Sequence, residues 1–288
     1  MKGRYSALIG SCLLLVLASA AGCTRENAQQ SAEGNYVKVR DQFLAQQAYE
    51  FHGRTQLLTG NTTNGNLVNF SGKKQRDQTY LTVSLSVPEK NQADTMSLLS
   101  KNQQLYAKFS DKESWKPVEG DQSLQQEFAN WDPVYSFEQM DAMRTKVIPL
   151  ADRSPDDGRK AFRVLLDANK LKTWLAEQMT AQARSKVQSI ATPKLKLAMT
   201  LSESEWKRRP AGARIQAAET KSKINEIIDQ MEVEAEYTVY YDEKRMLPTS
   251  LIMNIRSEYD MQNQRVNEHS EIETYLLNYG RADTNRQP

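Results

Sequence analysis

The amino-acid sequence predicts an α+β fold in which amphipathic helices cover an antiparallel sheet. Stretches of alternating apolar and polar residues recur before and after a central helical region, and short turn-forming stretches separate many of them. The longest helical pattern, over residues 168–190, repeats apolar side chains every three or four positions. A helix with one apolar face needs an apolar surface to cover, and the alternating strands supply one.

The first 23 residues have the layout of an export signal that ends in a lipid-attachment site. Lys2 and Arg4 give a positively charged start, residues 7–18 form an apolar run too short to span a bilayer, and small residues precede Cys23. A plain secretory signal also has small residues before its cleavage site, but it needs no cysteine there. The pattern resembles the lipobox of bacterial lipoproteins, which implies a diacylglycerol, with or without an N-acyl chain, on Cys23.

Such a lipid anchors the chain to the extracytoplasmic face of the cell membrane. Each buried methylene contributes about 0.8 kcal/mol, and one acyl chain holds only marginally, whereas two or three hold firmly. Because Cys12 lies in the discarded signal and Cys23 carries the lipid, no thiol remains for a disulfide. We therefore expect the exported domain to be held together by its own core.

Composition and charge indicate a folded body that does not bind nucleic acid. Hydrophobic residues make up 39% of the chain and charged residues 26%, which is typical of globular proteins. Removal of residues 1–22 takes away the two cations Lys2 and Arg4 and no acidic residue, which lowers the formal net charge from +2 to zero. A neutral balance argues against a nucleic-acid partner. The lipid is then the expected link to the membrane.

We expect a single folded domain over residues 43–280. The other segments are a signal peptide, a lipidated N-terminus with a flexible linker, and a frayed tail, at residues 1–22, 23–42 and 281–288. The linker assignment depends on the polar stretch that follows Cys23. A short helix is expected around residues 37–47, close to the start of the domain.

The first half of the domain predicts a series of antiparallel strands. They are expected over residues 48–58, 67–72, 80–87, 93–99 and 103–109. The clearest alternation places Leu81, Val83, Leu85 and Val87 on one face of a strand. A short edge piece is expected at residues 115–118, because Pro117 has no N–H to donate to a neighbouring strand.

A helical region and a hairpin follow. Helices are expected over residues 123–128 and 136–143, with a break at Trp131-Asp132-Pro133. Strands at residues 145–151 and 160–167 are joined by a turn. The turn contains the pair Asp156 and Asp157, which suits a metal or acid site, but the flanking Pro155 and Gly158 favour a plain turn.

The last part of the chain predicts two helices and three strands. The helices are expected over residues 168–190 and 220–231, and the strands over 232–241, around 251–255 and around 272–279. Between the helices, a basic insertion near residues 192–220 is a candidate surface for anionic headgroups. A solvated excursion without a role is the alternative.

This layout resembles the LolA/LolB and LppX/LprG group of lipoprotein and lipid carriers. The resemblance covers roughly residues 43–279 and includes the segments Trp115-Lys116-Pro117-Val118 and 237–248, besides the lipidated cysteine, the hairpin and the long helix. It implies a strongly curved, unclosed antiparallel barrel with helices covering its mouth. It also implies an apolar cavity between sheet and helices that accepts acyl chains.

The candidate cavity residues come from two strands and from the long helix. They are Leu81, Val83, Leu85, Val87, Trp174, Leu175, Met179, Tyr237, Val239 and Tyr241. The three residues of the helix would form a lid. A solid core requires the same pattern, so the sequence leaves a filled and a hollow interior equally open.

Two functions therefore remain. The first is a membrane-anchored lipoprotein that binds a lipid or other apolar ligand in this cavity, as carrier or sensor. The second is a non-catalytic scaffold with a solid core that docks a protein partner of the cell envelope or of sporulation.

We expect no enzymatic activity, no metal and no cofactor other than the covalent lipid. His52 and His269 belong to no catalytic motif, and no nucleophile elbow, phosphate-binding glycine loop or zinc-spaced ligand set is present in the sequence. Glu232, Glu234 and Glu236 share one face of a strand, which suits calcium binding or, more simply, a solvated sheet face.

Overall fold

The computed structural model describes most of the expected domain. The described residues are 31–59, 67–86, 93–109, 113–118, 122–151, 158–190, 222–261 and 264–281. The export signal with Cys23, the turn that contains Asp156 and Asp157, and the basic insertion lie outside them.

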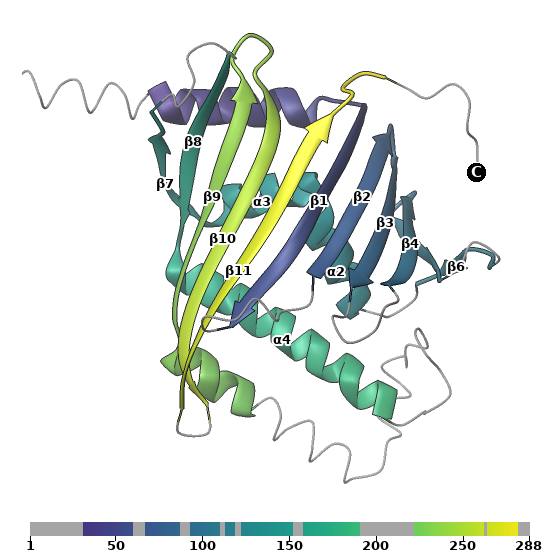
Figure 1. Ribbon diagram of the computed structural model, residues 1–288, viewed down its shortest axis with the longest axis vertical. Coiled ribbons are helices and arrows are strands. Elements are labelled where there is room, and N and C mark those ends of the chain that lie inside the picture. The colour runs from purple at the N-terminus through teal and green to yellow at the C-terminus, as the bar shows by residue number, and fades with distance from the viewer. Residues whose placement is uncertain are drawn as a thin grey trace, which may run out of the picture.

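An antiparallel sheet of eleven strands dominates the molecule (Figure 1). Its strands lie in the spatial order β6-β5-β4-β3-β2-β1-β11-β10-β9-β8-β7. Their bounds are β1 Ala48–Thr59, β2 Leu67–Gln75, β3 Gln78–Ser86, β4 Ala93–Lys101, β5 Gln104–Lys108, β6 Lys116–Pro117, β7 Arg144–Pro149, β8 Arg159–Leu166, β9 Glu232–Asp242, β10 Leu247–Met261 and β11 Gln264–Leu277. Since β6 and β7 are the two edges, the sheet is not closed, and the expected α+β fold with an unclosed antiparallel sheet is confirmed.

Helices lie on one face of this sheet, behind it in the view of Figure 1. They are an N-terminal helix over residues 31–44, α2 (Gln122–Trp131), α3 (Pro133–Met143), α4 (Ala168–Ile190) and a short helix over residues 222–230. The N-terminal helix crosses one end of the sheet and α4 crosses toward the other end (Figure 1). We call the face that they cover the inner face.

The order of the strands explains why helices cross the inner face. Strands β1 to β6 and strands β7 to β11 each follow one another along the chain and in space, so only the segment between β6 and β7 connects the two edges. That segment contains α2 and α3. The break between them is the expected one: the Asp132 side chain accepts a hydrogen bond from the N–H of Val134 at 3.0 Å, and Pro133 occupies the first turn of α3.

The two halves of the sheet are joined at its centre by β1 and β11, and two glycines shape the strands beside this joint. Gly53 is paired with Phe70, and Gly72 is paired with Phe51. A Cβ atom would lie 2.5 Å from the Phe70 ring at Gly53 and 2.4 Å from the Phe51 ring at Gly72. Each phenylalanine therefore packs directly on the backbone of a glycine in the neighbouring strand.

The core lies between the inner face and the helices. Period-two alternation places one face of each strand inside, as β9 shows with buried Val233, Ala235, Tyr237, Val239 and Tyr241. Aromatic rings fill the end near the N-terminal helix, where the ring centroids of Phe43 and Phe137 are 5.1 Å apart. The core is therefore continuous from the N-terminal helix to the sheet.

The N-terminal helix corrects part of the expected linker. The linker was expected to extend to residue 42, but the chain is already helical at residue 31. Ala32, Tyr36, Val39 and Phe43 are buried at spacings of three and four residues, which is one stripe of a helix. The polar residues between them hide this stripe in the sequence.

Candidate functional site

The helical layer over the inner face is incompletely sealed along α4. This helix contacts β9 and α2. Leu171, in its first turn, is fully buried, whereas Trp174, Leu175 and Met179 are only half buried although they pack on the core. Phe128 of α2 is half buried in the same way. Apolar side chains of the layer thus remain partly in contact with solvent.

A small pocket lies between this layer and the sheet. Its volume is about 10 Å³, which is room for one water-sized group. Its walls come from α2, α3, α4 and the inner faces of β9, β10 and β11: Asn130, Ser136, Gln139, Trp174, Tyr237, Leu251, Met253, Ile272 and Thr274. The pocket therefore has a polar side, mainly from the helices, and an apolar floor from the sheet.

Three polar atoms of the pocket residues are buried without a hydrogen-bond partner in the described part of the chain. They are Oδ1 of Asn130, Nε2 of Gln139 and Nε1 of Trp174. The amide of Gln139 is held in place because its Oε1 accepts a hydrogen bond from the Tyr237 hydroxyl at 2.6 Å. Leaving a buried polar group unpaired costs about 1–3 kcal/mol, so the pocket favours a group that bonds to these atoms.

The electrostatic environment of the pocket is neutral. None of its lining residues, as far as the chain is described, has a charged side chain. Burial raises the pKa of Tyr237, so its phenol stays protonated and can donate its hydrogen bond to Gln139. The pocket therefore offers hydrogen bonds without a countercharge.

The structure brings only two of the expected cavity residues to this pocket, Trp174 and Tyr237. Val239 and Tyr241 belong to the buried inner face of β9, and Leu81 and Val83 to the buried inner face of β3. Leu175 and Met179 lie half buried on α4. Val87 and the side chain of Leu85 lie outside the described residues. Alternation identifies the inner face correctly, but that face is much longer than one pocket.

The sequence pattern did not indicate the polar residues of the pocket. Gln139 stands in α3 between Phe137 and Met140, and all three side chains are buried. A glutamine in a helical pattern is normally interpreted as solvent-facing, so only the packing of α3 on the sheet shows its role. Thr274 of β11 is buried and its neighbour Tyr275 is exposed, whereas the sequence pattern did not decide which of the two faces inward.

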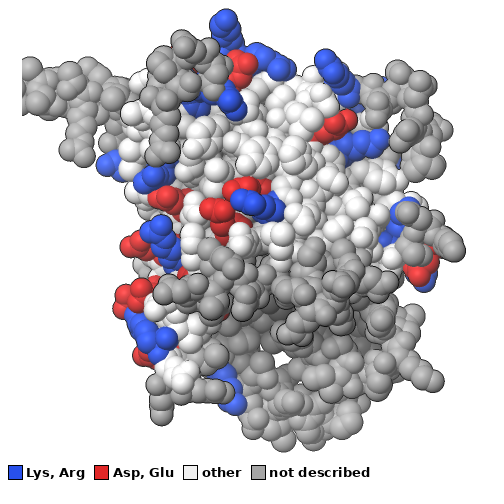
Figure 2. All heavy atoms as spheres, in the orientation of Figure 1, with Lys and Arg blue, Asp and Glu red and all other residues white. Residues whose placement is uncertain are grey.

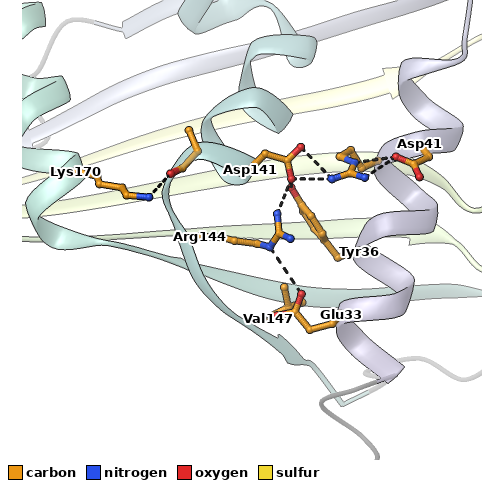
Figure 3. A network of polar contacts seen from close by, with 9 residues as sticks. Glu33, Tyr36, Asp41, Asp141, Arg144, Val147 and Lys170 are labelled. Atoms are coloured by element: carbon orange, nitrogen blue, oxygen red, sulfur yellow. Dashed lines mark hydrogen bonds and ion pairs between the residues drawn. The ribbon is translucent and has the colours of Figure 1, made fainter.

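A polar network fastens the N-terminal helix to the junction of α3 and β7 (Figure 3). The Asp141 carboxylate accepts hydrogen bonds from the Tyr36 hydroxyl at 2.7 Å, from Arg40 at 2.9 Å and from Arg144 at 2.5 Å. The guanidinium carbon of Arg144 lies 4.6 Å from the centroid of the Tyr36 ring. One carboxylate thus ties the helix that follows the expected anchor to the folded body.

The same helix covers the edge strand β7. The N–H of Val147 donates to Oε1 of Glu33 at 3.2 Å, and Pro149 in this strand has no N–H to offer. On the opposite edge, β6 ends in Pro117. An unpaired strand edge is a template for association with another chain, and each described edge strand contains a proline that interrupts its row of N–H donors.

The outer face of the sheet is polar and carries both histidines. His52 stacks on Tyr275 with ring centroids 5.4 Å apart, and His269 is hydrogen-bonded to Asn254 at 3.0 Å. Arg54 and Glu273 form an ion pair at 2.9 Å. Figure 2 shows charged side chains of both signs next to one another on this face.

The three glutamates that suit calcium also lie on this outer face. Glu232 pairs with Arg265 at 3.3 Å and Glu236 pairs with Arg163 at 3.4 Å, while Glu234 is exposed. Within the described ranges, no three His, Cys, Asp or Glu side chains gather closely enough to hold a metal ion.

Of the helices in the described part of the chain, none has the length and apolar character required to cross a membrane.

No protein-family model matches the sequence, and no curated protein matches it. Among solved structures, the chain is similar to a LolA superfamily protein from Nitrosomonas europaea, with 8% identity over 89% of this chain and 97% of that one and a TM-score of 0.29. A DUF1329 family protein from Desulfovibrio piger shows 8% identity over 89% and 95%, with a TM-score of 0.28. A hypothetical protein from Chlamydia trachomatis shows 11% identity over 82% and 92%, with a TM-score of 0.25. Similarity at this level assigns neither a family nor a function.

Proposed function

We propose that the protein is a lipid-anchored surface lipoprotein that binds a lipid or other apolar ligand between the sheet and α4, as carrier or sensor. The observation that carries this proposal is the half-buried row of Trp174, Leu175 and Met179 on α4, which contacts β9, a strand with buried apolar side chains on its inner face. Apolar surface gains about 25 cal/mol per Å² when it leaves water. An acyl chain inserted beside α4 covers these side chains.

Insertion of an acyl chain requires α4 to move. The pocket beneath the helices measures about 10 Å³, whereas pockets for drug-sized ligands measure about 300–1,000 Å³. Because the side chains of α4 are less buried than those of the sheet, separating α4 from the sheet exposes less new apolar surface than opening the sheet itself. We expect α4 to act as the lid.

The proposed anchor keeps the domain near the bilayer. Residues 24–30 separate Cys23 from the first described residue of the N-terminal helix. Even fully extended, that stretch spans at most roughly 28 Å. A ligand released from the outer leaflet therefore travels only a short distance to the domain.

The small size of the pocket favours the alternative function, an interaction scaffold of the envelope or of sporulation with a solid core. The two functions differ in whether lipid enters the protein. Native mass spectrometry of the protein from residue 24 onward, produced without the anchor, should show bound lipid. The fluorescence emission of a fluorescent fatty acid should increase when the protein takes it up.

Two matched variants of α4 test whether this helix contacts the ligand. Leu175→Asp combined with Met179→Asp should reduce uptake about tenfold or more, because two charges then face the inserted chain. Thr173→Asp, on the exposed side of the same helix, should bind as the unaltered protein does. A lipid-free mass together with no uptake by the unaltered protein establishes the scaffold instead.

A further inference from the structure

The polar side of the pocket selects for one kind of ligand group. It offers the N–H donors of Gln139 and Trp174 and the acceptor oxygen of Asn130, each buried and unpaired within the described residues. A group that accepts two hydrogen bonds and donates one satisfies all three. A hydroxyl group does so, whereas a carboxylate or a phosphate diester only accepts.

The uncharged lining of the pocket also favours a hydroxyl group over an ionised group. No cation is present among the described lining residues, and Gln139, only 6% exposed, lies well inside the protein. An ionised headgroup buried here has no countercharge, and its desolvation is far more costly than that of a hydroxyl group. The ligand group in this pocket is therefore uncharged.

Size and surroundings define the rest of the ligand. A volume of about 10 Å³ admits one oxygen-sized group. Leu251, Met253 and Ile272 form the floor, and Trp174 links the pocket to the half-buried row on α4. A hydroxyl group in the pocket thus continues into an apolar chain beneath α4.

We propose that the pocket binds the free hydroxyl group of a neutral amphiphile, such as a diacylglycerol, and discriminates against fatty-acid anions and phospholipids. This inference rests on the proposed function, since it names the ligand class of the same site. The N–H groups of Trp174 and Gln139 donate hydrogen bonds to the ligand hydroxyl, and Oδ1 of Asn130 accepts one from it.

Photolabelling in membranes tests the inference on the full chain. Membranes from cells that produce the protein are given either a diacylglycerol or a fatty acid, both carrying the same diazirine-bearing acyl chain with an alkyne tag. After irradiation, the label on the protein is measured. The diacylglycerol should label it at least about threefold more than the fatty acid, as expected from one hydrogen bond made only by the hydroxyl.

Two tryptophan variants separate the hydrogen bond from the ring. Trp174→Phe removes the indole N–H and keeps an aromatic ring, so it should lower diacylglycerol labelling about three- to tenfold and leave fatty-acid labelling unchanged. Trp131→Phe is the matched control, because Trp131 is also half buried, packs on Phe70 with centroids 6.4 Å apart and does not line the pocket. Trp131→Phe should change neither the diacylglycerol labelling nor the fatty-acid labelling.

The outcomes distinguish this inference from the function on which it rests. Equal labelling by the two lipids, or equal diacylglycerol labelling of Trp174→Phe and the unaltered protein, overturns the inference and means that the pocket holds water only. Absence of labelling by both lipids overturns the proposed function as well. If Trp174→Phe does not fold, mapping the diacylglycerol label on the unaltered protein decides: label on peptides with Trp174 or Met253 supports the inference, and label elsewhere overturns it.

Discussion

At the scale of single residues, Gly53 and Gly72 leave no room for a side chain in the sheet. A Cβ atom at Gly53 would lie 2.0 Å from the backbone oxygen of Glu273 and 2.5 Å from the Phe70 ring. Backbone cannot move away as a flexible side chain can, so even one methyl group is too large here. These two glycines allow the strands around the β1–β11 joint to approach their neighbours closely.

We predict that Gly53→Ala lowers the free energy of unfolding by about 1–3 kcal/mol through overpacking. Urea unfolding followed by circular dichroism measures the change. Gly34→Ala is the matched control: Gly34 is exposed in the N-terminal helix with no atom within 4 Å of an added Cβ, so the same substitution should stabilise by roughly 0.5–1 kcal/mol. Equal effects of the two substitutions would contradict this account.

Residue patterns predicted burial well and the pocket poorly. Leu81, Val83, Tyr237 and Val239 were assigned to an inward face by alternation alone, and all four are buried. Gln139 was not found, because its partner Tyr237 stands 98 positions away in the sequence. Local periodicity reports which side of an element faces the core, but it does not report which distant element will lie there.

At the scale of elements, the N-terminal helix depends on the carboxylate of Asp141. Partial burial raises the pKa of Asp141, but hydrogen bonds from Tyr36 and Arg40 and the charges of Arg40 and Arg144 outweigh burial and lower it. A carboxyl group whose pKa is lower in the folded protein stabilises the fold above its unfolded pKa of about 3.9, and this contribution disappears as the pH falls through the lower folded value.

We therefore predict that Asp141→Asn destabilises the protein by about 1 kcal/mol at pH 7 and weakens the loss of stability below about pH 4. Urea midpoints measured from pH 7 to pH 3 test both effects. Asp41→Asn, which removes an exposed carboxylate that contacts only Arg40 among the described residues, should leave the pH dependence nearly intact. Parallel pH profiles for the unaltered protein and Asp141→Asn would show that the network does not stabilise the folded state.

Most elements were predictable from the sequence, and the exceptions have physical reasons. Helix α4 was expected with its observed bounds because its apolar spacing is long and regular. Strands β10 and β11 are longer than expected. In β10 the inward position after Ile255 is the buried Ser257, which interrupts the apolar alternation in the sequence, and residues 264–271 of β11 are mostly polar. The helix over residues 31–44 was assigned in part to a linker, because a four-residue apolar stripe is weak evidence until a partner surface is known.

At the scale of the whole molecule, the proposed lipid on Cys23 determines where the protein is found. We predict that Cys23→Ser moves the protein from the membrane fraction to the soluble or extracellular fraction and abolishes metabolic labelling with a radioactive acyl chain. Cys12→Ser, within the same signal, should change neither. Unchanged fractionation of Cys23→Ser would remove the anchor from the proposed function.

The class of fold was predictable at this scale, but the strand order was not. Successive hairpins follow from short turns, which the sequence shows. Pairing of β1 with β11 places the first strand beside the last, and no pattern in either strand specifies a partner so distant.

The pairing of β1 with β11 also sets the order in which the molecule can be assembled. Short connections join β1 to β6, β7 to β8, and β9 to β11 into neighbouring hairpins, while β8 and β9 are separated by residues 167–231, which include α4. The hydrogen bond from Asn278 to Glu50 at the joint spans the largest of these separations, 228 positions. Contacts so distant form late, because closing a long loop costs entropy before any contact repays it. During synthesis from the N-terminus, one edge of β1 therefore stays unpaired until β11 has been made and pairs with it. The chain is most prone to aggregate before this pairing forms.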